Sequence, residues 1–456
     1  MKKKMNQIEK KVLEKITPTD KYRKKLKGIL EEIKIGIEKE VKKRKLPVET
    51  ILVGSIAKDT YLMKNMDIDF FLCFPTNLKK DKIAENALSI GKELLEDTEE
   101  SYAEHPYIRG YFKKYYVEIV PCYKIEKASQ KLSAVDRTPL HTDYVKKNLK
   151  EEQKKEVRLF KQFLKGIGCY GAEAQVQGFS GYLCEILILY YGTFQKLLYN
   201  AKKWKHKEKL SLKKGDHPDF DTSLIFIDPV DPNRNVASAI SKEKFDLFVK
   251  ASKYYLEKPD IKFFFPNSIK PWSIEKIKKE IQKQDCKYVA IKFDEPKIID
   301  ENLYPQIRKA EKSIIQACKE NDFKVYDTQF YINKKEKKIF IIIKTQTKEL
   351  SYTKIHEGPP LKLKKNVDEF NRKWKNNKRV VRNPFEKNNR INVEIKREYV
   401  DIKDFLRNVL LNLSLGKHLD EKIMEEFDIV QINDLLEENL RFFWTKYLDD
   451  KYSWER

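Results

Sequence analysis

Two aspartates, Asp67 and Asp69, stand two residues apart and lead into an apolar run, Phe70-Phe71-Leu72. Alternate side chains of a strand point to the same side, so both carboxylates are expected on one face. Two neighbouring anions repel each other and lose hydration, and a bound cation relieves both costs. The spacing therefore predicts a metal site, against the alternative of a solvated acidic face at a strand end.

The flanking segments favour the metal site. A short strand over 49–53 runs into Gly54 and Ser55, a turn that can present backbone N–H groups and a hydroxyl to a phosphate. A second apolar strand, 115–120, carries Glu118 in its middle. Carboxylates suit Mg²⁺. The six cysteines contain no Cys-x-x-Cys pair and are expected to be buried and reduced.

This order of strand, Gly-Ser, Asp-x-Asp and a third acidic strand resembles the nucleotidyltransferase superfamily of DNA polymerase β. Longer segments resemble the archaeal, class I CCA-adding tRNA nucleotidyltransferases, in order over roughly residues 45–245. They are Ser133-Ala134-Val135-Asp136-Arg137-Thr138-Pro139-Leu140-His141-Thr142, Tyr170-Gly171-Ala172-Glu173, Gly178-Phe179-Ser180-Gly181-Tyr182-Leu183-Cys184-Glu185 and Asp228-Pro229-Val230-Asp231-Pro232-Asn233-Arg234-Asn235-Val236-Ala237.

The resemblance implies an enzyme that adds C, C and A to the 3′ end of tRNA without a template, taking CTP twice and then ATP. Asp67, Asp69 and Glu118 would be catalytic and would hold two Mg²⁺ ions. The residues that would bind the nucleotide are Gly54, Ser55, Lys58, His141, Lys161, Tyr170 and Arg234. Of these, Arg234 would read the base. Glu118 replaces the more usual Asp, and Lys58 stands where relatives commonly have arginine.

Other interpretations apply to single residues. Arg234 could instead form an ion pair with Asp228 or Asp231. Tyr170 could be a core aromatic residue, and His105 is interpreted as structural.

The whole chain has 456 residues, 94 Lys and Arg against 70 Asp and Glu, and a net charge of +24. This excess favours a polyanionic partner, although a Lys-rich proteome would also produce it. Within residues 361–397, the candidate RNA-binding residues are Arg372, Lys373, Lys375, Lys378 and Arg379, interleaved with Phe370, Trp374 and Phe385. A solvated basic face is the alternative. No apolar run is long enough for a membrane span, and no signal-peptide core follows the N-terminus, so a cytoplasmic protein is expected.

The pattern predicts a multidomain α+β fold. We expect a catalytic head with a mixed sheet and helices over 1–143, a helical neck over 144–260 and an α+β body and tail that bind the tRNA acceptor arm over 261–456. Expected helices cover 22–45, 80–95, 182–204 (capped by Ser180) and 305–321, and further strands cover 224–227, 287–293, 323–331 and 339–345.

Two rival functions share the Asp-x-Asp core or the basic surface. One is a poly(A) or oligoadenylate polymerase, and the other is a catalytically inactive RNA-binding protein. The aromatic segment around Trp444 could pack internally or support a homodimer.

Overall fold

The computed structural model describes residues 6–63, 66–102, 106–215 and 217–456. His105, interpreted above as structural, lies outside these residues. The chain forms two compact units, residues 1–268 with 451–456 and residues 269–450. The division into head, neck and body predicted from the sequence is finer than this and stays a prediction. No helix in the described ranges is long and apolar enough to cross a membrane.

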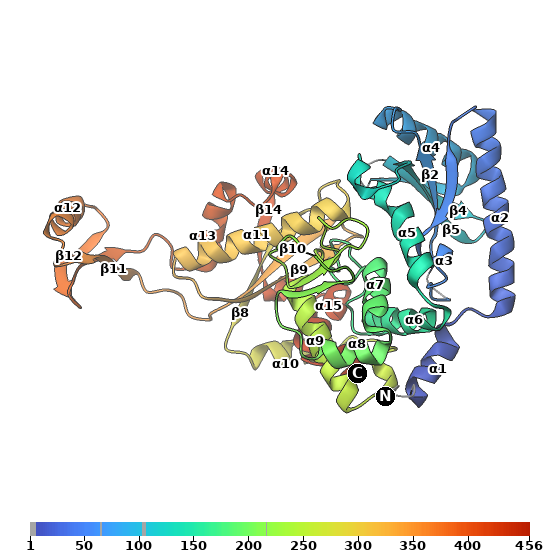
Figure 1. Cartoon of the computed structure of the whole chain (residues 1–456). Helices are drawn as coiled ribbons and strands as arrows, with labels where there is room; N and C mark the ends of the chain where they lie inside the picture. Colours follow the sequence, from blue (N-terminus) through green and yellow to red (C-terminus); the bar gives the residue numbers. More distant parts are fainter. Residues whose placement is uncertain (1–5, 64–65, 103–105, 216) are drawn as a thin grey trace. The chain divides into compact units, whose positions relative to one another are not determined.

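The first unit begins with a sheet flanked by helices (Figure 1). Its strands lie in the order β1-β2-β5-β4-β3, and β2 and β5 are parallel. The elements are α1 (Gln7–Ile16), α2 (Asp20–Lys43), β1 (Glu49–Val53), α3 (Gly54–Ala57), β2 (Ile68–Phe74), α4 (Lys80–Leu94), β3 (Glu96–Tyr102), β4 (Pro106–Phe112), β5 (Tyr115–Tyr123) and α5 (Arg137–Asn148). The expected helices over 22–45 and 80–95 and the strand over 49–53 are confirmed, whereas β3 and β4 were not foreseen.

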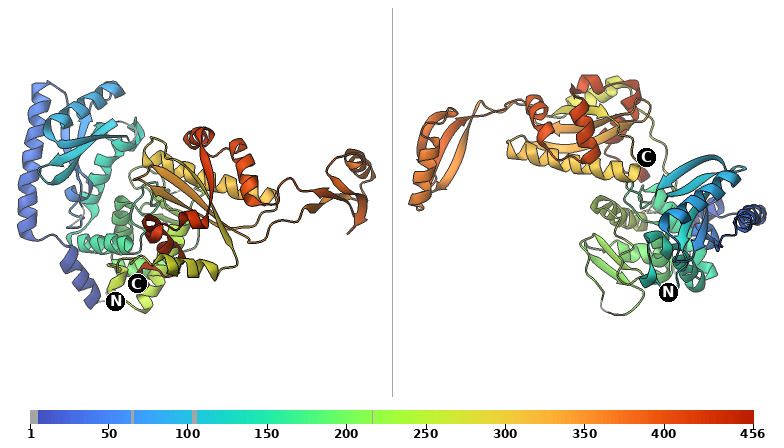
Figure 2. Two further views of the ribbon diagram at one scale, coloured as in Figure 1. Left: turned by 180° about the vertical axis from the view of Figure 1, so that it is seen from behind. Right: turned by 90° about the horizontal axis from the view of Figure 1, so that it is seen from above.

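Helices α2 and α4 cover one face of this sheet (Figure 2). The apolar stripe of α2, which includes Ile33 and Ile37, packs with Phe70 and Phe74 of β2. The neighbouring residues of β2 point to the opposite face, where Phe71 and Cys73 pack with Val120 and Cys122 of β5. Asp69 shares the parity of Phe71, so the strand pattern places its carboxylate on the face away from α2 and α4.

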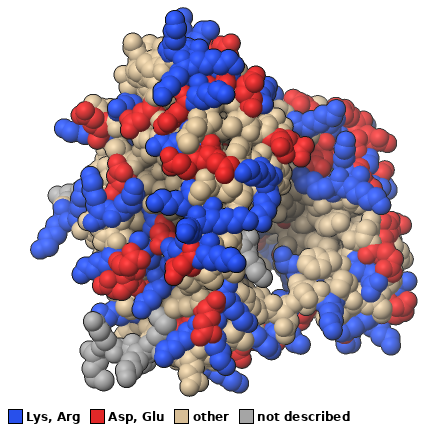
Figure 3. Space-filling view, turned by 90° about the vertical axis from the view of Figure 1, so that its right-hand side faces the viewer, with Lys and Arg blue, Asp and Glu red and all other residues tan. Residues whose placement is uncertain are grey.

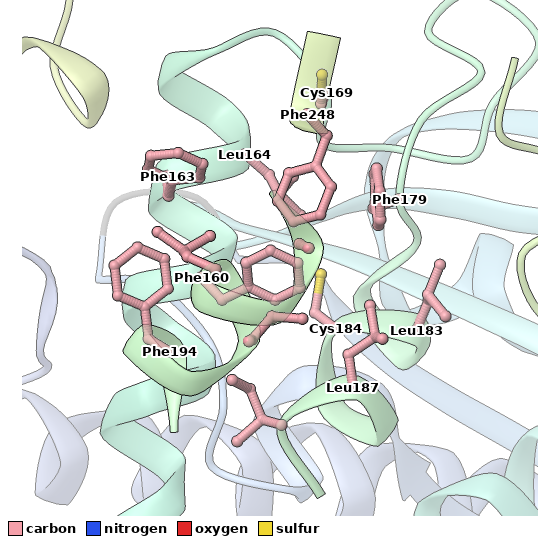
Figure 4. Close-up of a cluster of buried hydrophobic side chains, with 14 of the residues drawn as sticks. Phe160, Phe163, Leu164, Cys169, Phe179, Leu183, Cys184, Leu187, Phe194 and Phe248 are labelled. Atoms are coloured by element: carbon pink, nitrogen blue, oxygen red, sulfur yellow. The ribbon is translucent and has the colours of Figure 1, made fainter. Parts of the chain in front are cut away.

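The helical part of the first unit surrounds an aromatic core (Figure 4). Phe160, Phe163, Phe179, Phe194 and Phe248 are fully buried in it. The elements are α6 (Glu151–Gly166), α7 (Gly181–Tyr191), α8 (Phe194–Ala201), β6 (Glu208–Ser211), β7 (Leu224–Ile227) and α9 (Lys242–Glu257). Close aromatic packing of this kind fixes the helices that carry Lys161 and Glu185.

The expected single helix over 182–204 is wrong. Gly192 adopts a positive φ of 85° and ends α7, and the side chain of Thr193 accepts a hydrogen bond from Lys196 N to begin α8. The expected cap at the start is confirmed, since Ser180 Oγ accepts from Leu183 N.

The second unit contains a four-stranded antiparallel sheet in the order β14-β8-β10-β9. Its elements are α10 (Ile274–Gln282), β8 (Lys287–Asp294), α11 (Asp300–Glu320), β9 (Val325–Asn333), β10 (Lys338–Thr345), α13 (Ile402–Val409), α14 (Lys417–Glu425), β14 (Phe427–Gln431) and α15 (Arg441–Leu448). The expected strand, helix, strand, strand order is confirmed, with β14 as an additional edge strand. Trp444 of α15 is fully buried against Tyr288 and Phe340. Of the two alternatives for this segment, Trp444 follows the one in which it packs internally.

A second sheet in this unit has the order β11-β13-β12 and packs on α12 (Figure 2). The elements are β11 (Thr353–Pro360), α12 (Lys364–Trp374), β12 (Val380–Lys387) and β13 (Arg390–Lys396). Trp374 is buried against Val393 and Ile395, so it is a core residue here and not an exposed stacking platform.

Candidate active site

Strand pairing brings two of the predicted carboxylates together. Asp69 of β2 lies opposite Glu118 in the parallel β5, and opposite Val53 at the end of β1. Asp67 immediately precedes β2. The sequence predicted that these three acids share a site, and their electrostatic interactions with one another support that grouping.

Gly54 is required by this packing. It has φ +72°, a conformation that side-chain-bearing residues rarely adopt, and a Cβ atom built on it would lie 1.9 Å from Asp69 Oδ2. The next residue, Ser55, sits at the start of the single-turn helix α3. The predicted Gly-Ser turn is therefore the opening of α3, held against the Asp69 carboxylate.

The acids are electrostatically unfavourable without a cation. Burial, together with the charges of Glu118 and Asp67, raises the pKa of Asp69 to about 8. Burial raises the pKa of Glu118, an effect increased by Asp67 and opposed by Arg109. The pKa of Asp67 is raised by burial, an effect opposed by Lys165. Carboxylates that repel one another in this way fit a divalent cation.

Among the residues that the structure describes, no group of three or more His, Cys, Asp or Glu side chains is arranged to hold a metal ion by itself. Mg²⁺ in nucleotide-using enzymes is commonly bound by one or two carboxylates together with phosphate oxygens of the substrate. The donor set here fits that mode, in which the nucleotide completes the site.

A cavity of about 350 Å³ opens beside the carboxylates. It is lined by Ser55, Tyr61, Leu62, Met66, Asp67, Asp69, Lys161, Lys165 and Tyr170. Five of these are predicted site residues. The lining combines two acids with two lysines, and the charge of Lys165 acts on Asp67. Such a combination is suited to a metal-bound polyphosphate.

Two residues predicted to bind the nucleotide, Lys58 and Lys161, form ion pairs with one buried carboxylate. Glu185 is fully buried and accepts from Lys58 Nζ at 2.6 Å, Thr60 Oγ1 at 2.5 Å and Lys161 Nζ at 3.2 Å. Burial would raise the pKa of Glu185, but the two lysines lower it overall. Lys58 therefore does not line the cavity, while Lys161 reaches it from α6.

Tyr170 is held at the cavity by a narrow bend. Gly171 N donates to Phe179 O at 2.9 Å, Phe179 N donates to Cys169 O at 2.8 Å, and a Cβ on Gly178 would lie 2.1 Å from Cys169 O. The ammonium group of Lys165 lies 5.3 Å from the Tyr170 ring centroid. Tyr170 is half-buried and open to the cavity, which favours a ligand contact over a purely structural role.

His141 and Arg234 meet at a second anion, Asp228, which is fully buried. Both His141 Nε2 and Arg234 Nη1 lie 2.9 Å from Asp228 Oδ2, and the Tyr182 hydroxyl donates to Oδ1 at 3.1 Å. The His141 and Tyr182 rings stack with centroids 4.1 Å apart. The ion pair with Asp228 that the sequence offered as the alternative for Arg234 is thus formed. Asp231 pairs instead with Lys131 and Arg137.

These groups differ in charge near neutral pH. Burial lowers the pKa of His141, so its ring is neutral and donates an N–H to Asp228. Burial opposes ionisation of Asp228, but hydrogen bonds from His141, Val230 N and Arg234 outweigh it and hold its pKa well below the usual range. The ring of Tyr182 also lies 5.9 Å from Lys58 Nζ, which connects this cluster with the Glu185 network.

Lys165, Tyr182 and Glu185 are candidate site residues that sequence reasoning missed. Tyr182 and Glu185 lie in the segment Gly178–Glu185 that carried the family resemblance, so a signal was present. Lys165 lies four residues after Lys161 on α6, and this helical spacing places both lysines on one face.

Comparison with known proteins identifies the class first. The sequence model described as "Nucleotidyltransferase domain" matches residues 34–141, and "tRNA nucleotidyltransferase, second domain" matches residues 155–265. The model described as "CCA-adding enzyme, C-terminal domain" matches residues 285–431. The chain is a nucleotidyltransferase, and its class uses nucleotide substrates and a divalent metal.

Curated relatives define the family. The CCA-adding enzyme of Methanosarcina barkeri is 35% identical over 96% of this chain and 97% of its own length. The CCA-adding enzyme of Archaeoglobus fulgidus is 34% identical over 95% of this chain and 97% of its own. The chain belongs to the family of CCA-adding enzymes. A solved structure of the Cid1 poly(U) polymerase is also similar, with 17% identity, a TM-score of 0.44, and coverage of 55% of this chain and 94% of that one; no conclusion about activity rests on it.

Proposed function

We propose that the chain adds C, C and A to the 3′ end of tRNA, using CTP and ATP and no nucleic-acid template. The observation that carries the proposal is the cavity beside Asp67 and Asp69, lined also by Lys161, Lys165 and Tyr170, in a chain that belongs to the CCA-adding family. The reaction joins the tRNA 3′-hydroxyl oxygen to the α-phosphorus of the nucleotide. The hydroxyl loses its proton, the bond between the α-phosphorus and the oxygen that bridges to the β-phosphorus breaks, and pyrophosphate leaves.

Asp67, Asp69 and Glu118 are assigned to two Mg²⁺ ions, which when bound would activate the hydroxyl and neutralise charge on the triphosphate. Ser55 and the N–H groups that open α3 are assigned to donate to phosphate oxygens. Lys161 and Lys165 supply positive charge to the triphosphate from the lining of the same cavity, and Tyr170 contacts the nucleotide beside them.

His141 and Arg234 are assigned to the nucleotide through the Asp228 cluster. Asp228 orients the guanidinium of Arg234, whose remaining N–H groups can donate to the ring-nitrogen acceptor that cytosine and adenine share. Uracil and guanine present an N–H at that place, which leaves a donor facing a donor.

Contacts with tRNA are assigned to the basic segment around the end of α12, namely to Arg372, Lys373, Lys375, Lys378 and Arg379. The finer assignments of head to 1–143, neck to 144–260 and body and tail to 261–456 belong to this proposal. A cytoplasmic location and a homodimer stay predictions of the sequence.

Asp69→Asn tests the assignment of the acids. The rate of nucleotide addition should fall by about 10²–10³-fold or more, because the lost charge acts on the transition state, while tRNA affinity measured by filter binding should stay within a factor of about two. Because the folded-state pKa of about 8 lies above the unfolded value, the metal-free fold loses stability as the pH rises from the unfolded pKa towards 8, where Asp69 ionises in the unfolded chain but stays protonated in the folded one. Metal-free Asp69→Asn should therefore melt at a higher temperature than the wild type at pH 8, with a smaller difference at pH 6.

Glu152→Gln on α6 is the control, since Glu152 is exposed and distant from the acids in sequence. Near-normal turnover of Asp69→Asn would contradict the assignment of this carboxylate to catalysis.

A further inference from the structure

A second cavity, of about 280 Å³, lies in the second unit where β11 begins and β13 ends. It is lined by Asn321, Lys354, His356, Trp374, Arg379, Ile395, Arg397, Glu398 and Tyr399. None of these residues takes part in the nucleotide site proposed above. The lining is rich in aromatic rings and cations, the combination with which proteins hold unpaired nucleotides.

The cations that line this cavity differ in whether they already pair with a carboxylate. Lys354 Nζ lies 2.9 Å from Asp322 Oδ2, and Arg397 pairs with the same carboxylate. Arg379 is exposed and forms no ion pair among the described residues; its side chain donates only to Lys396 O, at 3.4 Å. The guanidinium of Arg379 therefore has donors free for an anion, although Glu398 in the same lining disfavours a dense cluster of negative charge.

The aromatic rings of the lining pack against one another, and two N–H groups of the lining have no acceptor among the described residues. His356 stacks on Phe370 at 5.8 Å and contacts Trp374 at 5.1 Å between ring centroids. Burial, with the charges of Lys354, Lys373 and Arg379, lowers the pKa of His356, so its ring is neutral. Within the described part of the chain, Trp374 Nε1 and Arg397 Nε are buried and have no hydrogen-bond partner. A buried donor without an acceptor costs free energy, and an acceptor on a ligand would recover it.

We propose that this cavity binds a single unpaired ribonucleotide, with its base against the His356 ring, an acceptor of the base on Trp374 Nε1 and its phosphate on Arg379. The volume admits one base but no helix, and a paired base would keep its acceptors hidden. Two sources can supply this ligand, an unpaired nucleotide of the tRNA or a free mononucleotide. The first source rests on the function proposed above, because it requires tRNA to be the substrate.

The test is chemical modification of every base of a tRNA with and without the full-length protein. The wild type should protect an unpaired base that Arg379→Gln and Trp374→Phe leave exposed. Lys387→Gln, which changes another exposed cation of the same sheet, should keep the protection. Each cavity variant should also weaken tRNA binding about three- to tenfold, the expected effect of losing one hydrogen bond.

Salt dependence separates the two contacts. Arg379→Gln should reduce the slope of log affinity against log salt by about 0.9, as one phosphate contact is lost, and Trp374→Phe should leave the slope unchanged. Arg379→Gln decides the outcome if Trp374→Phe melts early, because Arg379 is exposed.

The second arm adds 5′-AMP or 5′-CMP. Quenching of wild-type but not Trp374→Phe fluorescence, with the tRNA footprint unaltered in all variants, would assign the site to a free mononucleotide.

Equal footprints in all proteins, together with no quenching by either mononucleotide, would overturn the inference. CCA addition by the wild type is measured on the same tRNA. If CCA addition occurs while the footprints stay equal and neither mononucleotide quenches the fluorescence, the cavity proposal fails alone. If CCA addition does not occur, the proposed function is refuted.

Discussion

Glu185 is the residue on which the phosphate-binding side of the site depends. Its carboxylate is fully buried and holds Lys58, from the loop after α3, and Lys161, from α6. Two lysines share one carboxylate, so the network keeps a net positive charge, and of the two lysines it is Lys161 that lines the cavity. A triphosphate beside Lys161 would share that charge without moving the helices.

Glu185→Gln should destabilise the first unit by about 3–5 kcal/mol, because removing one partner leaves two buried ammonium groups uncompensated. The measurement is the free energy of unfolding in urea. The wild-type contribution is present above the unfolded pKa of a glutamate and is lost as pH falls, because the lysines lower the folded pKa. Glu152→Gln should have no such effect, and equal stability of both variants would show that the network contributes little.

At the scale of elements, the connection from β1 through α3 to β2 positions the site. β1 ends at Val53 opposite Asp69, and Gly54 turns the chain against that carboxylate. Replacing Gly54 by alanine should lower the free energy of unfolding by about 1–2 kcal/mol, because a residue with a Cβ is strained in the left-handed region. The new Cβ must also displace Asp69.

Gly54→Ala should therefore lower both stability and turnover, the latter by about 10²-fold if the carboxylate moves by an ångström. Gly28→Ala is the matched control. Gly28 lies within α2, and a Cβ atom added to it would have no described atom of another part of the chain within 4 Å, so this change should stabilise the protein by about 0.5–1 kcal/mol. Thermal melting and single-turnover rates distinguish the two, and full activity in Gly54→Ala would contradict the tight packing described here.

Local patterns predicted much of this architecture. The apolar stripe of α2 follows from helical periodicity, and the short apolar runs of β2 and β5 predict strands that are buried on both faces. The break between α7 and α8 was missed although Gly192 and Thr193 signal it, because the apolar run continues through them. β3 is an acid-rich strand, Glu96–Tyr102, at the edge of its sheet, where charged residues are tolerated and strand propensity is a poor guide.

The site was only partly predictable for a related reason. Spacing identifies Asp67 and Asp69 because they stand two residues apart at the start of one strand. The ion pair between Lys58 and Glu185 joins residues 127 positions apart in the chain. No local pattern shows which of the many lysines is buried against a carboxylate. The ion pair between Arg234 and Asp228 was foreseen as an alternative because those residues are close in sequence.

At the scale of the whole molecule, the net charge of +24 needs a polyanionic partner or a solvated surface. Figure 3 shows Lys and Arg distributed among Asp and Glu on one face, without exclusive clustering. The cations around the end of α12 are a denser group in the sequence. Contacts of such residues with phosphate release counterions, so affinity for RNA should fall steeply with salt.

Neutralising Arg372, Lys373, Lys375, Lys378 and Arg379 to glutamine should reduce the slope of log affinity against log salt by about 0.9 for each residue that contacts a phosphate. Binding of tRNA measured at several salt concentrations provides the slope. Neutralising five exposed lysines of α2 instead gives a control of equal charge. An unchanged slope in the first variant would place the tRNA on another surface.

The most direct test of the central proposal is incorporation of labelled nucleotides into a tRNA that ends just before its CCA sequence, with Mg²⁺ present. CTP alone should add two residues and stop, ATP should then add one, and UTP or GTP should add none. Wild-type protein that extends this tRNA with a run of adenylates, or that adds nothing while still binding it, would contradict the assignment as a CCA-adding enzyme.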